Sequence, residues 1–122
     1  MNNLQNSKPK YDLEERTFRF AKEVRLFVKT IQKTIANKED TKQVVRSSGS
    51  VGANYIEANE SLGKKDFLMR IKICRKEAKE SVYFLELINE TNNLENSNEA
   101  ARLIQEAIEL KKIFSSIIEK SK

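Results

Sequence analysis

Residues 46–57 read RSSGSVGANYIE, and this run of small side chains decides how closely the chain can pack. It contains Gly49 and Gly52, yet the residues around it follow a helical pattern. A glycine within an exposed helix costs about 1 kcal/mol relative to alanine, so something must compensate. We therefore expect a second helix to lie unusually close to these glycines.

The residues before this stretch predict an amphipathic helix. Asp12 can form a capping box with Glu15, and the helix continues to about Ile35. Mainly apolar residues recur every three or four positions and form a row, which keeps one face toward a partner helix. That row consists of Leu13, Thr17, Phe20, Val24, Phe27 and Ile31. Residues 1–11 lack this periodicity, so we expect a mobile tail before a single domain at 12–120.

A polar break at 37–40 follows the first helix. Asp40 and Gln43 can cap a second helix, which runs to about Leu62 and is stopped by Gly63. The stretch at 46–57 lies inside this second helix.

Two more helices complete the pattern. The third spans about 64–91, and Asn96 with Glu99 can cap the fourth after a short polar break. Short breaks between long helices favour antiparallel neighbours. The sequence therefore predicts an all-α fold, an antiparallel up-down-up-down four-helix bundle.

The third helix has more apolar residues than one buried face requires. A second row cannot share the face of its main seam, and it consists of Met69, Ile73, Phe84 and Leu87. A helix that is apolar nearly all round is buried on several sides. We interpret this row as an oligomer interface, and a wide core face is the alternative.

The net charge of +5 is unevenly distributed along the 122 residues. Residues 1–79 hold 18 basic and 10 acidic side chains, whereas residues 80–122 hold 5 basic and 8 acidic ones. The positive charge therefore belongs to the first part of the chain, where it could attract nucleic acid or an acidic partner.

Two basic rows are candidates for nucleic-acid binding. The denser row, on the third helix, consists of Lys64, Lys65, Arg70, Lys72, Lys76 and Lys79, and a sparser row on the first helix includes Arg19 and Lys22. No aromatic side chains alternate with these charges in the way that stacks bases. We expect any binding to follow the phosphate backbone with weak sequence specificity. A solvated helix face with no partner is the alternative.

A set of polar residues falls at helical spacing on the second and third helices. It consists of Arg46, Ser50, Asn54, Glu57, Arg75 and Glu77. Such a set can form a buried network that supports packing and assembly, or it can form a site. We favour the structural role, because ion-pair networks perturb charges as readily as active sites do.

Enzymatic chemistry is poorly supported. The chain has no histidine, which removes the usual nucleophile–histidine pairs and the histidine ligands of di-iron bundles. Cys74 lies among seam residues and is expected to be a core side chain. We predict no catalytic residue, metal or cofactor. A hidden hydrolase or metal enzyme would need an open carboxylate cluster, such as Glu57 with Glu77. The sequence also lacks a signal peptide and a membrane span, which predicts a cytoplasmic protein.

Four stretches together resemble a known family: RSSGSVGANYIEA at 46–58, KDF at 65–67, CRKEAKES at 74–81 and FLEL at 84–87. The chain is similar over residues 12–118 to the four-helix-bundle proteins encoded within intervening sequences of bacterial 23S ribosomal RNA genes. This resemblance implies a ring-like homopentamer. It also implies kinship with the accessory variability determinant of diversity-generating retroelements, a basic pentamer that binds nucleic acid and a reverse transcriptase.

These observations favour a non-enzymatic homo-oligomer, pentameric by the resemblance, that offers a basic surface to RNA, DNA or a nucleoprotein. The alternative is a structural or protein–protein adaptor whose basic residues only provide solubility.

Overall fold

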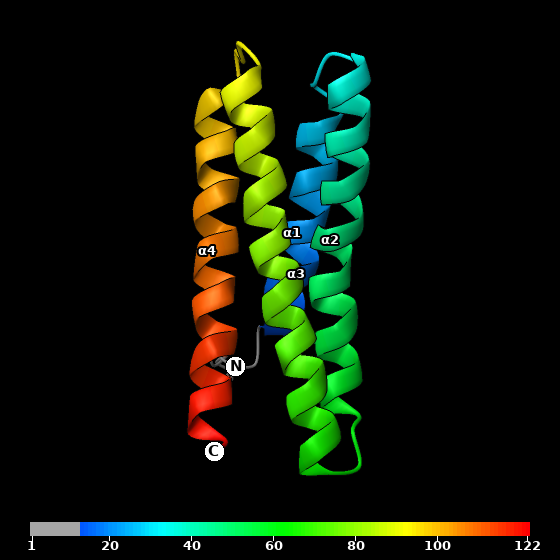
Figure 1. Ribbon diagram of the computed structural model, residues 1–122, viewed down its shortest axis with the longest axis vertical. Coiled ribbons are helices and arrows are strands. Elements are labelled where there is room, and N and C mark those ends of the chain that lie inside the picture. The colour runs from blue at the N-terminus through cyan, green and yellow to red at the C-terminus, as the bar shows by residue number, and fades with distance from the viewer. Residues whose placement is uncertain (1–12) are drawn as a thin grey trace, which may run out of the picture.

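The computed structural model describes residues 13–122, which form four helices. They are α1 (Leu13–Val28), α2 (Ile35–Asn59), α3 (Lys64–Thr91) and α4 (Ser97–Lys120). Each helix packs against the next in the chain, and α1 also packs against α4. Figure 1 shows the four running alternately up and down along one long axis, with α3 in front of α1. The predicted antiparallel up-down four-helix bundle is confirmed.

The core follows the predicted seam of the first helix. All six residues of the row that begins at Leu13 are buried, including the polar Thr17, whose hydroxyl donates to the carbonyl of Glu14 at 3.0 Å. Phe20 and Phe27 are among the largest fully buried side chains. Burial of this row stabilises the fold by removing apolar surface from water.

The stretch at 46–57 lies within α2, and the expected close approach is present. A β-carbon added to Gly52 would lie 2.9 Å from the Thr17 hydroxyl oxygen and 3.2 Å from the Thr17 β-carbon. At Gly49 the nearest atom is Nη2 of Arg25, 3.0 Å away. Only at Gly52, therefore, does the missing side chain let α1 pack closely against α2.

The predicted connection between the first two helices was wrong. α1 ends at Val28 and not near Ile35, because the backbone N–H groups of Thr30 and Ile31 donate to carbonyls three positions back, at 2.9 Å from Thr30 to Phe27. α2 begins at Ile35 because the Thr34 hydroxyl accepts a hydrogen bond from the backbone N–H of Asn37 at 3.1 Å.

As a result, Asp40 and Gln43 do not cap a helix: both lie inside α2, and the polar run at 37–40 is not a break. α2 also ends at Asn59, three residues before the predicted Leu62. Gly63 occupies the N-cap position of α3 in extended backbone, so it precedes a helix and does not stop one.

The ends of α3 agree with the prediction of a helix at 64–91. Asn96 does lie at the N-cap position of α4, but its side chain makes no capping hydrogen bond. Its carbonyl accepts from the N–H groups of Glu99 and Ala100, while the Glu99 carboxylate binds Arg102. The predicted cap pair was therefore wrong. The predicted tail and the Asp12 cap lie outside the described residues. No helix within residues 13–122 is long and apolar enough to cross a membrane.

Candidate nucleic-acid interface

The first half of α3 carries lysines on its outer face. Lys65, Lys72 and Lys76 line a shallow hollow of about 460 Å³ together with Leu68, Met69 and Ile73. Their spacing of seven and four positions places the ammonium groups on one side of the helix. The side chains of Lys64 and Lys79 are also exposed on α3.

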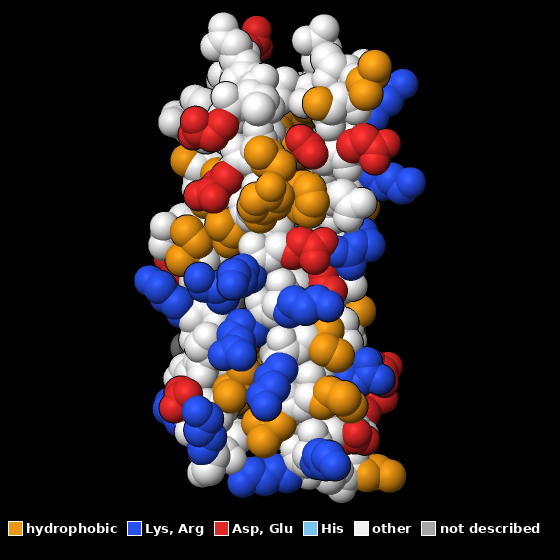
Figure 2. Space-filling view, viewed as in Figure 1, with side chains coloured by type: hydrophobic (Ala, Val, Ile, Leu, Met, Phe, Trp, Pro, Cys, Tyr) orange, Lys and Arg blue, Asp and Glu red, His pale blue; other side chains and the backbone are white. Residues whose placement is uncertain are grey.

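These lysines are not neutralised by acidic neighbours. Within residues 13–122, no lysine of α3 takes part in an ion pair. Figure 2 shows Lys and Arg side chains gathered over the middle and lower part of this face, which holds the first half of α3, and acidic side chains mostly elsewhere. Their positive charge is therefore available to an anionic partner.

The α1–α4 side of the bundle is different, because its arginines are paired. Arg16 lies 2.7 Å from the Glu106 carboxylate and 3.1 Å from Glu109, and the hydrogen bonds that Arg16 donates to Glu106 raise the pKa of Arg16. Arg102 bridges Glu23 and Glu99 at 3.0 and 2.7 Å. These pairs cancel charge locally, so the unpaired cations of α3 stand out by comparison.

The remaining predicted binding residues are not gathered with this hollow. Arg70 donates to the side-chain oxygen of Asn54 on α2 at 3.0 Å. Arg19 lies 4.0 Å from Glu15, and Lys22 lines a groove between α1 and α2. Since α1 lies diagonally across the bundle from α3, the two predicted basic rows occupy different sides of the molecule.

Part of the predicted polar network comes together around Arg46. Its guanidinium lies 3.2 Å from Glu77 and donates a hydrogen bond to Glu80, which was not in the predicted set. The hydrogen bond that Arg46 donates to Glu80 and the charge of Glu77 raise the pKa of Arg46. Glu77 is buried, and one of its oxygens lacks an aligned hydrogen bond, so this ion pair is its main compensation.

The other members of that set are placed elsewhere. The amide of Asn54 donates to the carbonyl of Ser50 at 2.9 Å, while Glu57 is exposed. Glu57 follows Arg46 by eleven positions, about 16 Å along α2, so it does not share the surroundings of Glu77. Arg75 is partly buried and makes no ion pair with the part of the chain that the structure describes.

Sequence reasoning missed a buried hydroxyl pair beside this network. The Ser47 and Ser81 hydroxyl oxygens lie 2.8 Å apart between α2 and α3, and Ser81 also donates to the carbonyl of Glu77 at 2.9 Å. Both serines are fully buried. Ser47 belongs to the small-residue stretch, which was the available signal, but its partner 34 positions away could not be identified from spacing.

The row interpreted as an oligomer interface is divided along α3. Met69 and Ile73 lie among the lysines of the basic hollow, with Met69 about half exposed. Phe84 and Leu87, both partly buried, lie more than 16 Å further along the helix by its rise of about 1.5 Å per residue. The structure therefore places the four residues in two separate groups.

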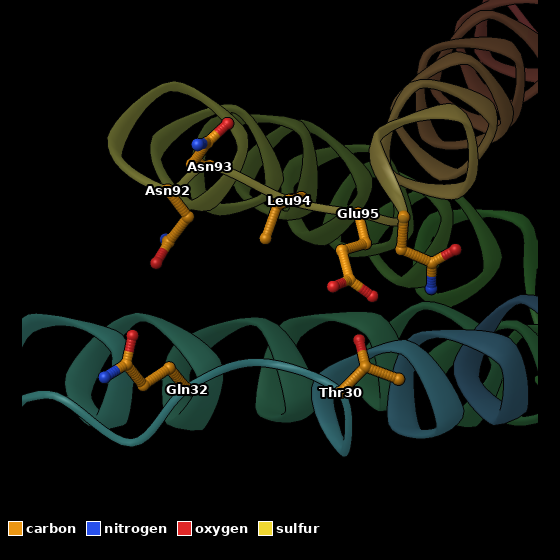
Figure 3. A pocket seen from close by; sticks show the side chains of 7 residues that line it. Thr30, Gln32, Asn92, Asn93, Leu94 and Glu95 are labelled. Carbon is orange, nitrogen blue, oxygen red and sulfur yellow. The ribbon is translucent and has the colours of Figure 1, made fainter.

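A polar cleft opens at the loop end of the bundle. It has a volume of about 510 Å³ and lies between the α1–α2 and α3–α4 connections (Figure 3). Beside it, Asn37 and Asn92 exchange side-chain hydrogen bonds of 2.7 and 2.9 Å. This pair joins the first turn of α2 to the end of α3, and sequence reasoning missed it because 55 positions separate the residues.

Cys74 is fully buried in the core. Burial raises the pKa of its thiol to about 12, so the sulfur is protonated at neutral pH and is a weak nucleophile. Over residues 13–122, no group of three or more Cys, Asp or Glu side chains is arranged to hold a metal ion.

Comparison with known families gives one match that covers most of the chain. Residues 10–116 match the model of the 23S rRNA-intervening sequence protein family. The chain belongs to this family. A search of curated proteins gives no match.

A solved structure supports the same assignment for this family member. It is the crystal structure of a protein of unknown function from the S23 ribosomal protein family of Bacteroides thetaiotaomicron VPI-5482. The two share 28% sequence identity and a TM-score of 0.76, over 86% of this chain and 96% of that one. The resemblance of the sequence motifs to the 23S rRNA-intervening sequence proteins is confirmed.

Proposed function

We propose that this family member is a non-catalytic, cytoplasmic homo-oligomer, a pentamer by the family resemblance, that binds the phosphate backbone of nucleic acid through the first half of α3. The observation that carries this proposal is the group of lysines around the α3 hollow, none of which has an acidic partner among the described residues. Phosphate oxygens would supply the missing negative charge, and each contact would release a counterion.

Assembly would strengthen this binding. A single hollow offers only three converging lysines, which supports weak and non-specific binding. Several copies in one ring would present the same surface repeatedly to a single strand, which raises the overall affinity through effective concentration. A nucleoprotein, including the complex with a reverse transcriptase that the resemblance implies, would meet the same surface.

The test compares two double variants with equal charge changes. Lys72→Gln with Lys76→Gln removes two lysines of the hollow, while Lys38→Gln with Lys42→Gln removes two exposed lysines of α2 at the same four-residue spacing. Binding to a generic single-stranded RNA is measured by fluorescence anisotropy over a series of salt concentrations. For each subunit in contact, the first variant should lower the slope of log affinity against log salt by about 1.4. The control should retain the wild-type slope, and equal slopes for all three proteins would refute the proposed surface.

A protein–protein adaptor is the second candidate. Large apolar side chains on α1 favour it, because Phe18 is 71% and Leu26 51% exposed. An adaptor of this kind would not bind RNA at low salt, so the same anisotropy titration separates the two functions.

A further inference from the structure

An apolar groove runs along the outer surface between α1 and α2. It has a volume of about 540 Å³, and small residues help to line it: Gly49, Gly52 and Ala53. Three large apolar side chains border it and are exposed by 71%, 51% and 45%: Phe18, Leu26 and Ile56. Contiguous exposed apolar surface of this kind marks a site of association.

The charges around this groove are mainly positive. Lys22, Arg25 and Lys29 line it, and none of them pairs with a carboxylate of residues 13–122. The guanidinium of Arg25 donates instead to two backbone carbonyls, at 3.0 and 3.2 Å. The acidic lining residue, Glu14, accepts a hydrogen bond from an amide of α2. The groove therefore suits an apolar partner that carries negative charge.

The second half of α3 carries a surface of that description. Tyr83, Glu86, Leu87 and Glu90 recur at helical spacing on its outer face. Tyr83 is 59% exposed and packs edge-on against Phe84, with ring centroids 5.2 Å apart. Glu86 and Glu90 are exposed and have no cationic partner within the described chain. Figure 2 shows apolar side chains gathered over this upper half of α3, with acidic side chains around them. We call these four residues the Tyr83 patch.

We propose that the Tyr83 patch of one subunit docks into the α1–α2 groove of the next copy of this chain. Tyr83 and Leu87 would cover the exposed Phe18 and Leu26, while Glu86 and Glu90 would meet the cations at the groove. The inference rests on the homo-oligomer of the proposed function and names the two surfaces that build it. The lysine hollow of α3 stays open in this arrangement.

Charge excludes the other pairings of these surfaces. Groove against groove would bring Lys22, Arg25 and Lys29 toward their own copies, and patch against patch would oppose carboxylates. The lysine hollow cannot enter the groove either, because both are basic. Opposite charges that align across an interface select the partner and its register.

The two surfaces lie on different sides of the subunit, so each copy offers one of each. The groove belongs to α1 and α2, while the patch lies on α3, diagonally across from α1. Contacts between two different surfaces are heterologous, and they close only when a ring is completed. A ring, and not a two-fold dimer, is therefore the expected assembly.

The test disables one surface at a time. Phe18→Asp removes the groove contact and keeps the patch, whereas Tyr83→Asp removes the patch and keeps the groove. Both side chains are largely exposed, so the core is untouched, which circular dichroism checks. Leu62→Asp, at a fully exposed apolar residue outside both surfaces, is the control. Masses are measured by light scattering after size-exclusion chromatography.

Each single variant is expected to run as a monomer, and Leu62→Asp to assemble like the wild type. An equimolar mixture of Phe18→Asp and Tyr83→Asp should form a heterodimer and grow no further, because one intact groove and one intact patch remain. The inference would be overturned if both single variants still formed the wild-type oligomer, or if their mixture gave no heterodimer. Either result would leave the proposed oligomer standing. A monomeric wild type would overturn both.

Discussion

The contact between Gly52 and Thr17 gives the sharpest test of how this bundle is held together. Alanine at position 52 would gain about 1 kcal/mol of helix propensity. Its β-carbon, however, would lie 2.9 Å from the Thr17 hydroxyl and 3.6 Å from the Thr17 backbone carbonyl carbon. Thr17 is fully buried and its hydroxyl donates a hydrogen bond to the Glu14 carbonyl, so the side chain cannot turn away without losing that bond. Overpacking of this kind costs about 1–3 kcal/mol.

Gly49→Ala is the matched control, because it makes the same change in the same helix. There the nearest atom belongs to the end of the flexible Arg25 side chain, which can move. We expect Gly49→Ala to stabilise the protein by up to about 1 kcal/mol through helix propensity alone. Gly52→Ala should then be less stable than Gly49→Ala by about 1–3 kcal/mol, the cost of overpacking.

Thermal unfolding followed by circular dichroism measures this difference, at one protein concentration because the proposed assembly would contribute to stability. At about 4 °C per kcal/mol, the two variants should unfold roughly 4–12 °C apart. Thr17→Ala removes the closest contact. In that background, Gly52→Ala should therefore lower the unfolding temperature by less. If Gly52→Ala were as stable as Gly49→Ala, the close approach of α1 and α2 would not require a small residue at position 52.

Two further predictions concern charge. Arg46→Ala should destabilise the protein by about 1–2 kcal/mol in urea titrations, because it leaves the buried Glu77 without its cation, whereas Arg75→Ala should change little. Equal losses of unfolding free energy in the two variants would contradict a structural role for the network around Arg46. Hydrogen bonds from Arg102 lower the pKa of Glu99, so this carboxylate stabilises the fold above its ordinary pKa and the effect is lost as pH falls through the lowered value. The unfolding temperature of Glu99→Gln should therefore approach that of the wild type on acidification from about pH 5 to about pH 2, and a constant difference would contradict this assignment.

The spacing of the apolar residues predicted the fold, because each helix of a bundle buries one face and the residues of that face recur every three or four positions. The row from Leu13 to Ile31 lies in the core, although Ile31 follows the end of α1. Helix ends were harder to predict, since they depend on a few competing hydrogen bonds. At 37–40 a run of polar residues resembled a break, while the true cap, Thr34, looked like any exposed threonine.

The candidate sites depend on contacts between distant parts of the chain, which spacing does not reveal. The lysines of α3 could be recognised in the sequence, but their lack of acidic partners became visible only when the neighbouring helices were in place. The reverse holds for Arg46, whose acidic partners lie on the next helix. A count of charges along the sequence could not separate these cases.

The two halves of α3 carry unpaired charges of opposite sign, which explains how one helix could serve two partners. In its first half, apolar Met69 and Ile73 lie among unpaired lysines, and in its second half Tyr83 and Leu87 lie beside unpaired glutamates. Both halves are amphipathic in the same way, so apolar area alone would let either one enter the α1–α2 groove. In the proposed assembly, the basic groove would repel the first half and attract the second. The sign of the charge would thus decide which half is buried between subunits in that proposed assembly, and it would leave the lysines facing outward for phosphate.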